Sequence, residues 1–265
     1  MIRLLPFCTA VVLAAAAPAA AQSPFDGTWK SDLSAASVTA RPNEFQIKDG
    51  TYSCASCLPA AYSVKADGAF HAVKDRPYWD AVSVSVVDDH TIAYQFRKGG
   101  KVIARNTQAV SPDGNTLSVK GVATANGAGT PIETAAVLTR AGPAPAGAHA
   151  ASGQWKAAPA ASVSDAALTF TLRIDGDMLH LKSPGMAESL DAKFGGPFVV
   201  NAGDPGKTMT KAERLSATAI RLTDMQLGKV TQVSTYTVAP DGASITGDWT
   251  DPRDGAKGTF VARKQ

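Results

Sequence analysis

The chain repeats itself over most of its length. Gly27-Thr28-Trp29-Lys30 recurs 126 positions later as Gly153-Gln154-Trp155-Lys156. Pro112-Asp113-Gly114 recurs as Pro240-Asp241-Gly242, at an offset of 128. Because the offset hardly changes, the two copies overlay almost without insertions. A repeat unit of this length is the size of a whole domain, so the sequence predicts two domains of one fold.

The first 21 residues have the features of a secretory signal peptide. Arg3 gives a short positive start, residues 4–17 form an apolar core, and Ala19-Ala20-Ala21 offers small residues for cleavage before Gln22. The apolar stretch is shorter than a membrane-spanning helix requires, and no second such stretch follows. We therefore expect a signal peptide at 1–21 and a soluble mature protein that is periplasmic or secreted, without a transmembrane segment.

The charge pattern argues against a nucleic-acid partner. The whole chain has a formal net charge of +3, and removal of Arg3 with the leader leaves 25 basic residues against 23 acidic ones. The Lys and Arg residues are scattered singly. A nucleic-acid interface would need a basic stripe with interleaved aromatic residues, and the sequence has none.

Each copy alternates apolar and polar residues with the period of a β-strand. In the second copy the apolar positions are Leu168, Phe170, Leu172 and Ile174, which predicts a half-buried strand. Asp175-Gly176 can form a two-residue hairpin turn, and counting back across that turn pairs Leu172 with Leu179. Asp49-Gly50 predicts the equivalent hairpin in the first copy. No amphipathic helix longer than about two turns is evident.

Short strands separated by Gly, Asp and Pro turns favour an all-β sandwich or barrel. We expect residues 22–140 to form the first barrel and residues 153–265 to form the second. Residues 141–152 are rich in Ala and Pro and carry no charged side chain, which predicts a linker of moderate stiffness.

A Gly-x-Trp motif on the opening strand, followed by a series of hairpins, resembles the calycin superfamily of lipocalins, fatty-acid-binding proteins and avidins. More closely, the mature chain resembles a group of bacterial secreted lipocalin-like proteins. The segments that carry this likeness are DGTYSCASCLP at 49–59, VKADG at 64–68, PYWD at 77–80 and VSPDGNTL at 110–117. The resemblance implies export and two tandem up-and-down β-barrels, with Trp29 and Trp155 closing barrel ends. It implies no particular activity. Each unit is shorter than a vertebrate lipocalin and lacks the later lipocalin motifs.

Cys54 and Cys57 are the two cysteines that remain after the leader, and in an oxidising compartment we expect a disulfide between them. Closing a four-residue loop stabilises by only about 2 kcal/mol, which favours a structural clip. A redox or metal role stays open as an alternative. A redox thiolate needs a helix N-terminus, but Leu58-Pro59 follows, and a metal needs two more ligands. His71 is the histidine we would add if zinc bound. We expect no cofactor and no metal.

Catalytic motifs are absent from the sequence. It contains no Gly-x-Ser-x-Gly, no His-Glu-x-x-His and no Gly-x-x-x-x-Gly-Lys. Acidic residues are frequent in turns, but no pair of them has a spacing that specifies acid–base chemistry. We therefore expect a protein that is not an enzyme.

One strand face in each copy is a candidate ligand lining. Residues 102–110 carry Asn106 and Gln108 on the face of the terminal valines, and the equivalent face of 230–238 carries Gln232 and Tyr236. If these faces point inward, their polar groups need partners, which a ligand or water could supply. If they point outward, the neighbouring apolar residues cover the core instead.

Tyr78 and Trp79 follow Pro77 ahead of a predicted strand, where they could line an entrance or cover the core. The resemblance favours an exported binding protein that holds a small apolar or amphipathic ligand in a barrel or in a cleft between barrels. A cavity of roughly 300 Å³ or more is expected inside one barrel. The alternative is a protein-interaction module of the cell envelope, such as a periplasmic protease inhibitor.

Overall fold

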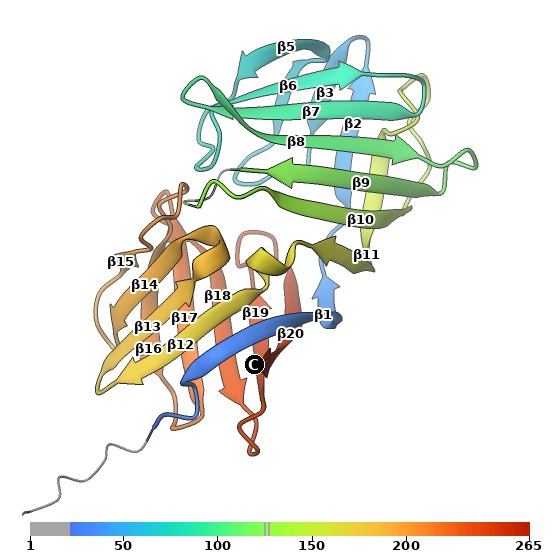
Figure 1. Ribbon diagram of the computed structural model, residues 1–265. Helices are drawn as coiled ribbons and strands as arrows, with labels where there is room; N and C mark the ends of the chain where they lie inside the picture. The colour runs from blue at the N-terminus through green and yellow to red at the C-terminus, as the bar shows by residue number, and fades with distance from the viewer. Residues whose placement is uncertain (1–21, 125, 127) are drawn as a thin grey trace, which may run out of the picture.

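The computed structural model describes residues 22–124, 126 and 128–265, so the expected signal peptide at 1–21 lies outside the described residues. Two antiparallel sheets of ten strands each curl into barrels (Figure 1). Barrel 1 has the strand order β4 (Tyr62–Lys65), β3 (Thr51–Cys54), β2 (Asn43–Lys48), β11 (Gly153–Val163), β10 (Ile132–Arg140), β9 (Thr116–Ala123), β8 (Lys101–Val110), β7 (Thr91–Lys98), β6 (Ala81–Val86) and β5 (Asp67–Ala72). The expected all-β fold with two tandem barrels is confirmed.

Barrel 2 has the strand order β14 (Glu188–Lys193), β13 (Met178–Ser183), β12 (Thr169–Asp175), β1 (Gly27–Thr39), β20 (Lys257–Lys264), β19 (Ser244–Thr250), β18 (Lys229–Val238), β17 (Ala219–Gln226), β16 (Met209–Arg214) and β15 (Val199–Val200). A parallel bridge joins Phe194, directly after the edge strand β14, to Ala212 of β16 near the opposite end of the sheet. The described helices are two short 3-10 turns, η1 (Asp165–Ala167) and η2 (Pro184–Met186), and no described helix has the length and hydrophobicity needed to cross a membrane.

The two opening strands are exchanged between the halves of the chain (Figure 1). β1 precedes all the strands of barrel 1 in sequence, yet it lies in barrel 2 between β12 and β20. β11 opens the second copy, yet it lies in barrel 1 between β2 and β10. The boundaries expected at 22–140 and 153–265 are therefore wrong for the first strand of each copy. Both copies open with the same Gly-x-Trp-Lys pattern, so either barrel can accept either strand.

The exchange also reassigns the two tryptophans. Trp29 is fully buried in the core of barrel 2, and Trp155 is fully buried in the core of barrel 1. Each indole Nε1 donates to the carbonyl oxygen four residues earlier, to Phe25 at 2.9 Å and to Ala151 at 2.8 Å. Each indole therefore fills one end of the barrel built mainly by the other half.

Residues 141–152 are folded, which corrects the expected linker. Ala151 and Ser152 are fully buried. The backbone N–H of Ile47 donates to Ser152 Oγ at 2.9 Å, and Arg140 donates to the carbonyl oxygens of Ser152 and Ala150. Ala151 occupies in barrel 1 the place that Phe25 has in barrel 2, because each accepts the bond of the following tryptophan. This segment is the end cap of barrel 1.

The two predicted hairpins have different outcomes. In the first copy Phe45 pairs with Cys54 across Asp49-Gly50, which confirms the hairpin predicted at that turn. In the second copy Leu172 pairs with Leu181 rather than Leu179. Asp175 pairs with Met178, so the turn is formed by the next two residues, beginning with Gly176 at φ 57°. The shift is two residues, and the period of a strand is two, so the apolar faces still coincide.

Candidate functional site

The amide-bearing face of β8 points into barrel 1. The Tyr94 hydroxyl donates to Gln108 Oε1 at 3.4 Å, and Tyr94 belongs to the buried core. Asn106 lies over Gly121, where a Cβ would come within 2.6 Å of its Oδ1. The inward orientation considered for this face is the one observed. A ligand-lining role for either amide stays a prediction, because protein groups already surround them.

Aromatic side chains fill much of the interior of barrel 1 beside this face. The Trp79 ring packs edge-on against Phe96 and Tyr62, with centroids 5.2 and 5.6 Å away. Tyr52 packs edge-on against Tyr94 at 5.5 Å. Burial raises the pKa of Tyr52 and Tyr94, so both phenols stay neutral over the range in which proteins fold. Trp79 therefore packs on the core of barrel 1, and a ligand-lining role for it stays a prediction.

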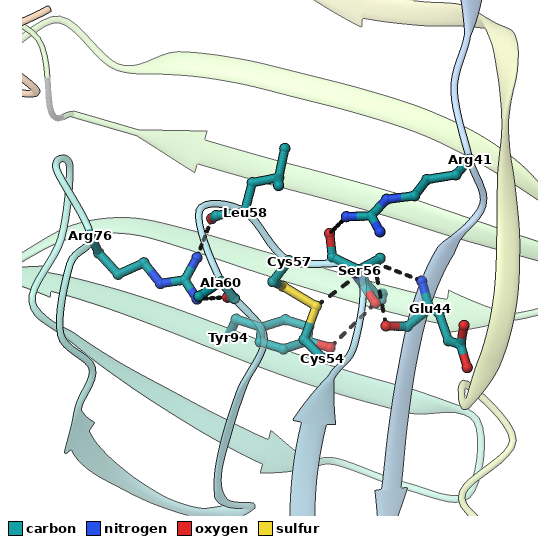
Figure 2. The surroundings of a disulfide bond; sticks show 10 residues. Arg41, Glu44, Cys54, Ser56, Cys57, Leu58, Ala60, Arg76 and Tyr94 are labelled. Atoms are coloured by element: carbon teal, nitrogen blue, oxygen red, sulfur yellow. Dashed lines mark hydrogen bonds between the residues drawn. A yellow bond between two sulfur atoms is a disulfide. The ribbon is translucent and has the colours of Figure 1, made fainter. Parts of the chain in front are cut away.

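A clamped loop closes the mouth of barrel 1. Figure 2 shows Arg76 reaching the carbonyl oxygens of Leu58 and Ala60, and both are hydrogen-bonded to its guanidinium. The same guanidinium lies 4.7 Å from the ring centroid of Tyr62. Arg76 is only 8% exposed, so the side chain that holds this loop is itself buried. Burial lowers its pKa, but a guanidinium starts so high that the charge remains.

The cysteine pair holds the other side of that loop (Figure 2). Cys54 and Cys57 form a disulfide with their Cα atoms 5.5 Å apart, and Cys54 is buried at the end of β3. The backbone N–H of Glu44 donates to Ser56 Oγ at 2.8 Å, and Arg41 donates to the Ser56 carbonyl at 3.1 Å. The loop is thus tied to both neighbouring segments, an arrangement that supports the structural interpretation of the disulfide.

Barrel 2 differs from barrel 1 at equivalent positions of its interior. The cross-strand pair Val82 and Phe96 of barrel 1 corresponds to Thr210 and Asp224 in barrel 2, where the Thr210 hydroxyl donates to the Asp224 carboxylate at 2.6 Å. On β18, Gln232 Nε2 donates to Ser234 Oγ at 2.9 Å. The second interior therefore has a polar wall where the first has an apolar one.

A pocket of about 250 Å³ opens from the surface into barrel 2. Its lining residues come from β1, η1, β12, β13, β18 and β20, and they are Ser31, Ala167, Phe170, Leu181, Ser183, Tyr236 and Phe260. Among these residues, Phe170 is the cross-strand partner of the buried Trp29. The Tyr236 and Phe260 rings meet edge-on at 5.4 Å. The volume is slightly below the roughly 300 Å³ expected for a ligand site.

Two carboxylates and one phenol of barrel 2 have raised pKa values. Burial raises the pKa of Asp224, against a smaller lowering by the Thr210 hydrogen bond, and the charge of Asp204 raises it further. Burial and the same Asp204 raise the pKa of Glu188. Burial raises the pKa of Tyr236, and the nearby charge of Asp224 adds to the shift. Asp224 thus faces the same interior as the pocket residue Tyr236.

Sequence reasoning identified Gln232 and Tyr236 on this wall but missed Asp224. The signal was available in the repeat, since Asp224 stands 128 positions after Phe96. A carboxylate at the inward position of a strand is unusual, because such groups are seldom buried without a partner. Comparison of the two copies position by position would have found it.

A second hollow of about 290 Å³ lies between the barrels. Pro59, Ala60, Asp75 and Pro77 from barrel 1 face the β17–β18 hairpin of barrel 2, including Leu227 and Lys229. Tyr78 lies at this junction. Gln226 Nε2 donates to the Tyr78 hydroxyl at 3.0 Å, and a Cβ at Gly206 would meet the Tyr78 ring at 2.5 Å. Tyr78 is a contact between the barrels.

Two of the four histidines form surface pairs with carboxylates. His71 contacts Asp67 at 2.8 Å, and His180 contacts Asp191 at 2.6 Å. Within residues 22–124, 126 and 128–265, no three His, Cys, Asp or Glu side chains gather in a metal-binding arrangement. The His71 side chain is bonded to its own strand, so the considered zinc set with Cys54 and Cys57 has no geometric support.

Comparison with known proteins does not identify the chain. No family model matches it, and no curated protein does. A solved structure of a DUF4623 family protein from Bacteroides eggerthii covers 92% of this chain and 78% of its own length, at 9% identity and a TM-score of 0.16. Such a likeness is too weak to carry an argument about fold or function. The calycin resemblance therefore remains an expectation, whereas the two-barrel fold is observed.

Proposed function

We propose that the protein is an exported, non-enzymatic binding protein that holds a small amphipathic molecule in the pocket of barrel 2. The observation that carries the proposal is that the β3–β4 end of barrel 1 is closed, whereas the equivalent end of barrel 2 is open. Barrel 1 is closed by the loop that Arg76 and the Cys54–Cys57 disulfide fasten. In barrel 2 the equivalent connection between β13 and β14 is the short turn η2, and Leu181, which stands for Cys54, lines an opening.

The lining supports an amphipathic occupant. Phe170, Leu181 and Phe260 offer apolar contact, and Ser31, Ser183 and the Tyr236 hydroxyl offer a few hydrogen-bonding groups. Small-molecule sites combine apolar contact with a few polar groups that fix orientation, and polar and apolar atoms contribute about equally to this lining. Trp29, the cross-strand partner of the lining residue Phe170, is fully buried, so this side of the pocket rests on a packed part of the core. The export of the chain remains part of the proposal, on the strength of the sequence of residues 1–21.

Binding of the fluorescent probe N-phenyl-1-naphthylamine tests the proposal. We expect saturable enhancement with the mature chain and at least a roughly tenfold loss of affinity in Ser183→Trp, because the indole fills a pocket of this size. Ser118→Trp on the exposed face of β9 is the matched control and should bind normally. Leu227→Asp, in the hollow between the barrels, should also bind normally.

Thermal melts of all three variants check that each is folded. Full binding by a folded Ser183→Trp would refute the pocket as the site. Loss of binding in Leu227→Asp alone would move the site to the hollow between the barrels. Native mass spectrometry of protein purified from its own host then reports which molecule, if any, is carried.

A further inference from the structure

We propose that the hollow between the barrels is a second binding site and that it takes a zwitterionic α-amino acid with an apolar side chain. The carboxylate of the amino acid pairs with Lys229, and its ammonium pairs with Asp75. This inference goes beyond the proposed function, because none of the described residues lines both this hollow and the pocket of barrel 2. Two observations support it: the backbone conformation of a residue in each wall, and the opposite charges that the two walls contribute.

The wall from barrel 2 contains a leucine where the first copy has a glycine. Leu227 stands 128 positions after Gly99, and both have positive φ, of 49° and 54°, in the turns that lead into β18 and β8. Glycine adopts this conformation freely, whereas a bulky side chain is strained there. Leu227 is also 61% exposed, so most of its apolar surface is left in water. Because backbone strain concentrates at functional sites, and Leu227 lines the hollow, we infer that this side chain contacts an occupant.

The wall from barrel 1 contains Asp75, which also has a positive φ, of 57°. Its neighbour Arg76 is hydrogen-bonded to the carbonyl oxygens of Leu58 and Ala60. The clamp that closes barrel 1 therefore also holds together the segments of Asp75 and Ala60, and both residues line the hollow. A group that is already held in place loses little conformational freedom when it binds, so this wall is prepared for a ligand.

Asp75 and Lys229 give the hollow one free charge of each sign. None of the ion pairs formed by residues 22–124, 126 and 128–265 involves either side chain. Arg253 also lines the hollow, but its guanidinium is bonded to the Asp251 carboxylate at 2.6 Å, so its charge is already matched. A molecule that carries both a carboxylate and an ammonium complements these two free charges, whereas a singly charged molecule leaves one of them unmatched.

The hollow has the size and the apolar surface that an amino acid needs. Its volume of about 290 Å³ lies at the lower end of small-molecule pockets, and Pro59, Pro77 and Leu227 offer contact for an apolar side chain. The two walls are joined by Tyr78, whose hydroxyl accepts from Gln226 Nε2 at 3.0 Å. Pro77 and Gln226, on either side of this contact, both line the hollow, so its walls are in place before a ligand binds.

Three probes that share one skeleton test the inference by calorimetric titration near pH 7: L-leucine, N-acetyl-L-leucine and L-leucinamide. The first is a zwitterion, the second lacks the ammonium, and the third lacks the carboxylate. Because hydrogen bonds between charged groups are the stronger ones, we expect leucine to bind about tenfold more tightly than either of the others.

Two variants assign the two charges. Lys229→Gln should weaken leucine and N-acetyl-leucine about tenfold and leave leucinamide unchanged. Asp75→Asn should weaken leucine and leucinamide about tenfold and leave N-acetyl-leucine unchanged, and Asn tolerates the positive φ of this position. Lys101→Gln, at the equivalent turn of the first copy, and Asp89→Asn, in an exposed turn, are the matched controls and should bind leucine normally.

Leu227→Gly separates ligand contact from a structural role. The variant relieves the strain at φ 49°, so Tm should stay the same or rise, while the affinity for leucine should fall severalfold because the apolar contact is lost. A residue with only a structural role would not combine these two effects.

No binding of leucine, equal binding of the three probes, or an unchanged leucine affinity in folded Lys229→Gln and Asp75→Asn would overturn the inference. Loss of leucine binding in folded Ser183→Trp would also overturn it, because the amino acid would then lie in the pocket of barrel 2. The naphthylamine test of that pocket is separate, so the failure of either proposal leaves the other standing.

Discussion

Removing one opening tryptophan should loosen the barrel in the other half of the chain. Trp29 is 0% exposed, and it packs among Phe25, Leu172 and Ile220 in barrel 2. Truncating a buried Trp to Ala typically costs about 3–5 kcal/mol, and here the Nε1 bond to Phe25 at 2.9 Å is lost as well. Every 1.4 kcal/mol is a factor of ten, so amide protection in barrel 2 should fall roughly 10²- to 10³-fold or more.

Hydrogen exchange with mass spectrometry locates the effect of Trp29→Ala. We expect faster exchange in peptides from β12 to β20 and little change in peptides from β2 to β9. Trp155→Ala should give the reverse pattern, because Trp155 packs in barrel 1. If Trp29→Ala instead loosened β2 to β9 and left β12 to β20 protected, each barrel would contain its own opening strand, and the exchanged topology would be refuted.

Three further predictions concern the interior groups. Cys54→Ser together with Cys57→Ser should lower the stability of barrel 1 by about 2 kcal/mol and leave barrel 2 unchanged, as calorimetry can show; a loss in barrel 2 would contradict the local role of the clip. The pKa of Asp224 is raised in the folded state, so this group binds its proton more tightly when folded, and its contribution to stability falls as pH rises above 3.8 through the raised value. Asp224→Asn should therefore raise Tm at pH 7, and the gain should shrink toward pH 3.5; a gain that is constant with pH would count against the buried carboxylate. Gly247→Ala would place a Cβ 2.0 Å from the Phe260 ring, so Tm should fall by an amount equivalent to about 1–3 kcal/mol, and an unchanged Tm would show that the ring moves freely.

The sequence predicted the fold type because its signals are local. Alternation with period two, tight turns and the repeat are properties of neighbouring residues or of two aligned copies. The Phe45–Cys54 register followed from Asp49-Gly50, whose two residues both have positive φ, of 49° and 70°. At Asp175-Gly176 the chain turns one residue later, and a strand pattern of period two is equally satisfied by either register.

The exchange of opening strands could not be predicted from the same signals. Gly27-Thr28-Trp29-Lys30 and Gly153-Gln154-Trp155-Lys156 present the same apolar residue at the same place, so local pattern fits both barrels equally. The connecting segments decide which barrel each opening strand joins. β1 leads to β2 through residues 40–42, and β11 leads to β12 through η1. The two opening strands also contact each other where they cross between the barrels. These connections are features of the tertiary structure, and neither residue propensity nor hydrophobic periodicity predicts them.

The two copies share one fold but differ in how each barrel is closed and in how polar its interior is. Where both copies agree, as at the tryptophan and its carbonyl partner, the residues seal a barrel end. Where they differ, the first copy has a loop fastened by a disulfide and an arginine, and the second has an opening and an inward-facing, half-buried carboxylate. A carboxylate with one side-chain donor at this inward position costs more free energy than the Phe96 ring at the equivalent place in the first copy, so we expect barrel 2 to unfold at the lower temperature, which calorimetry can show.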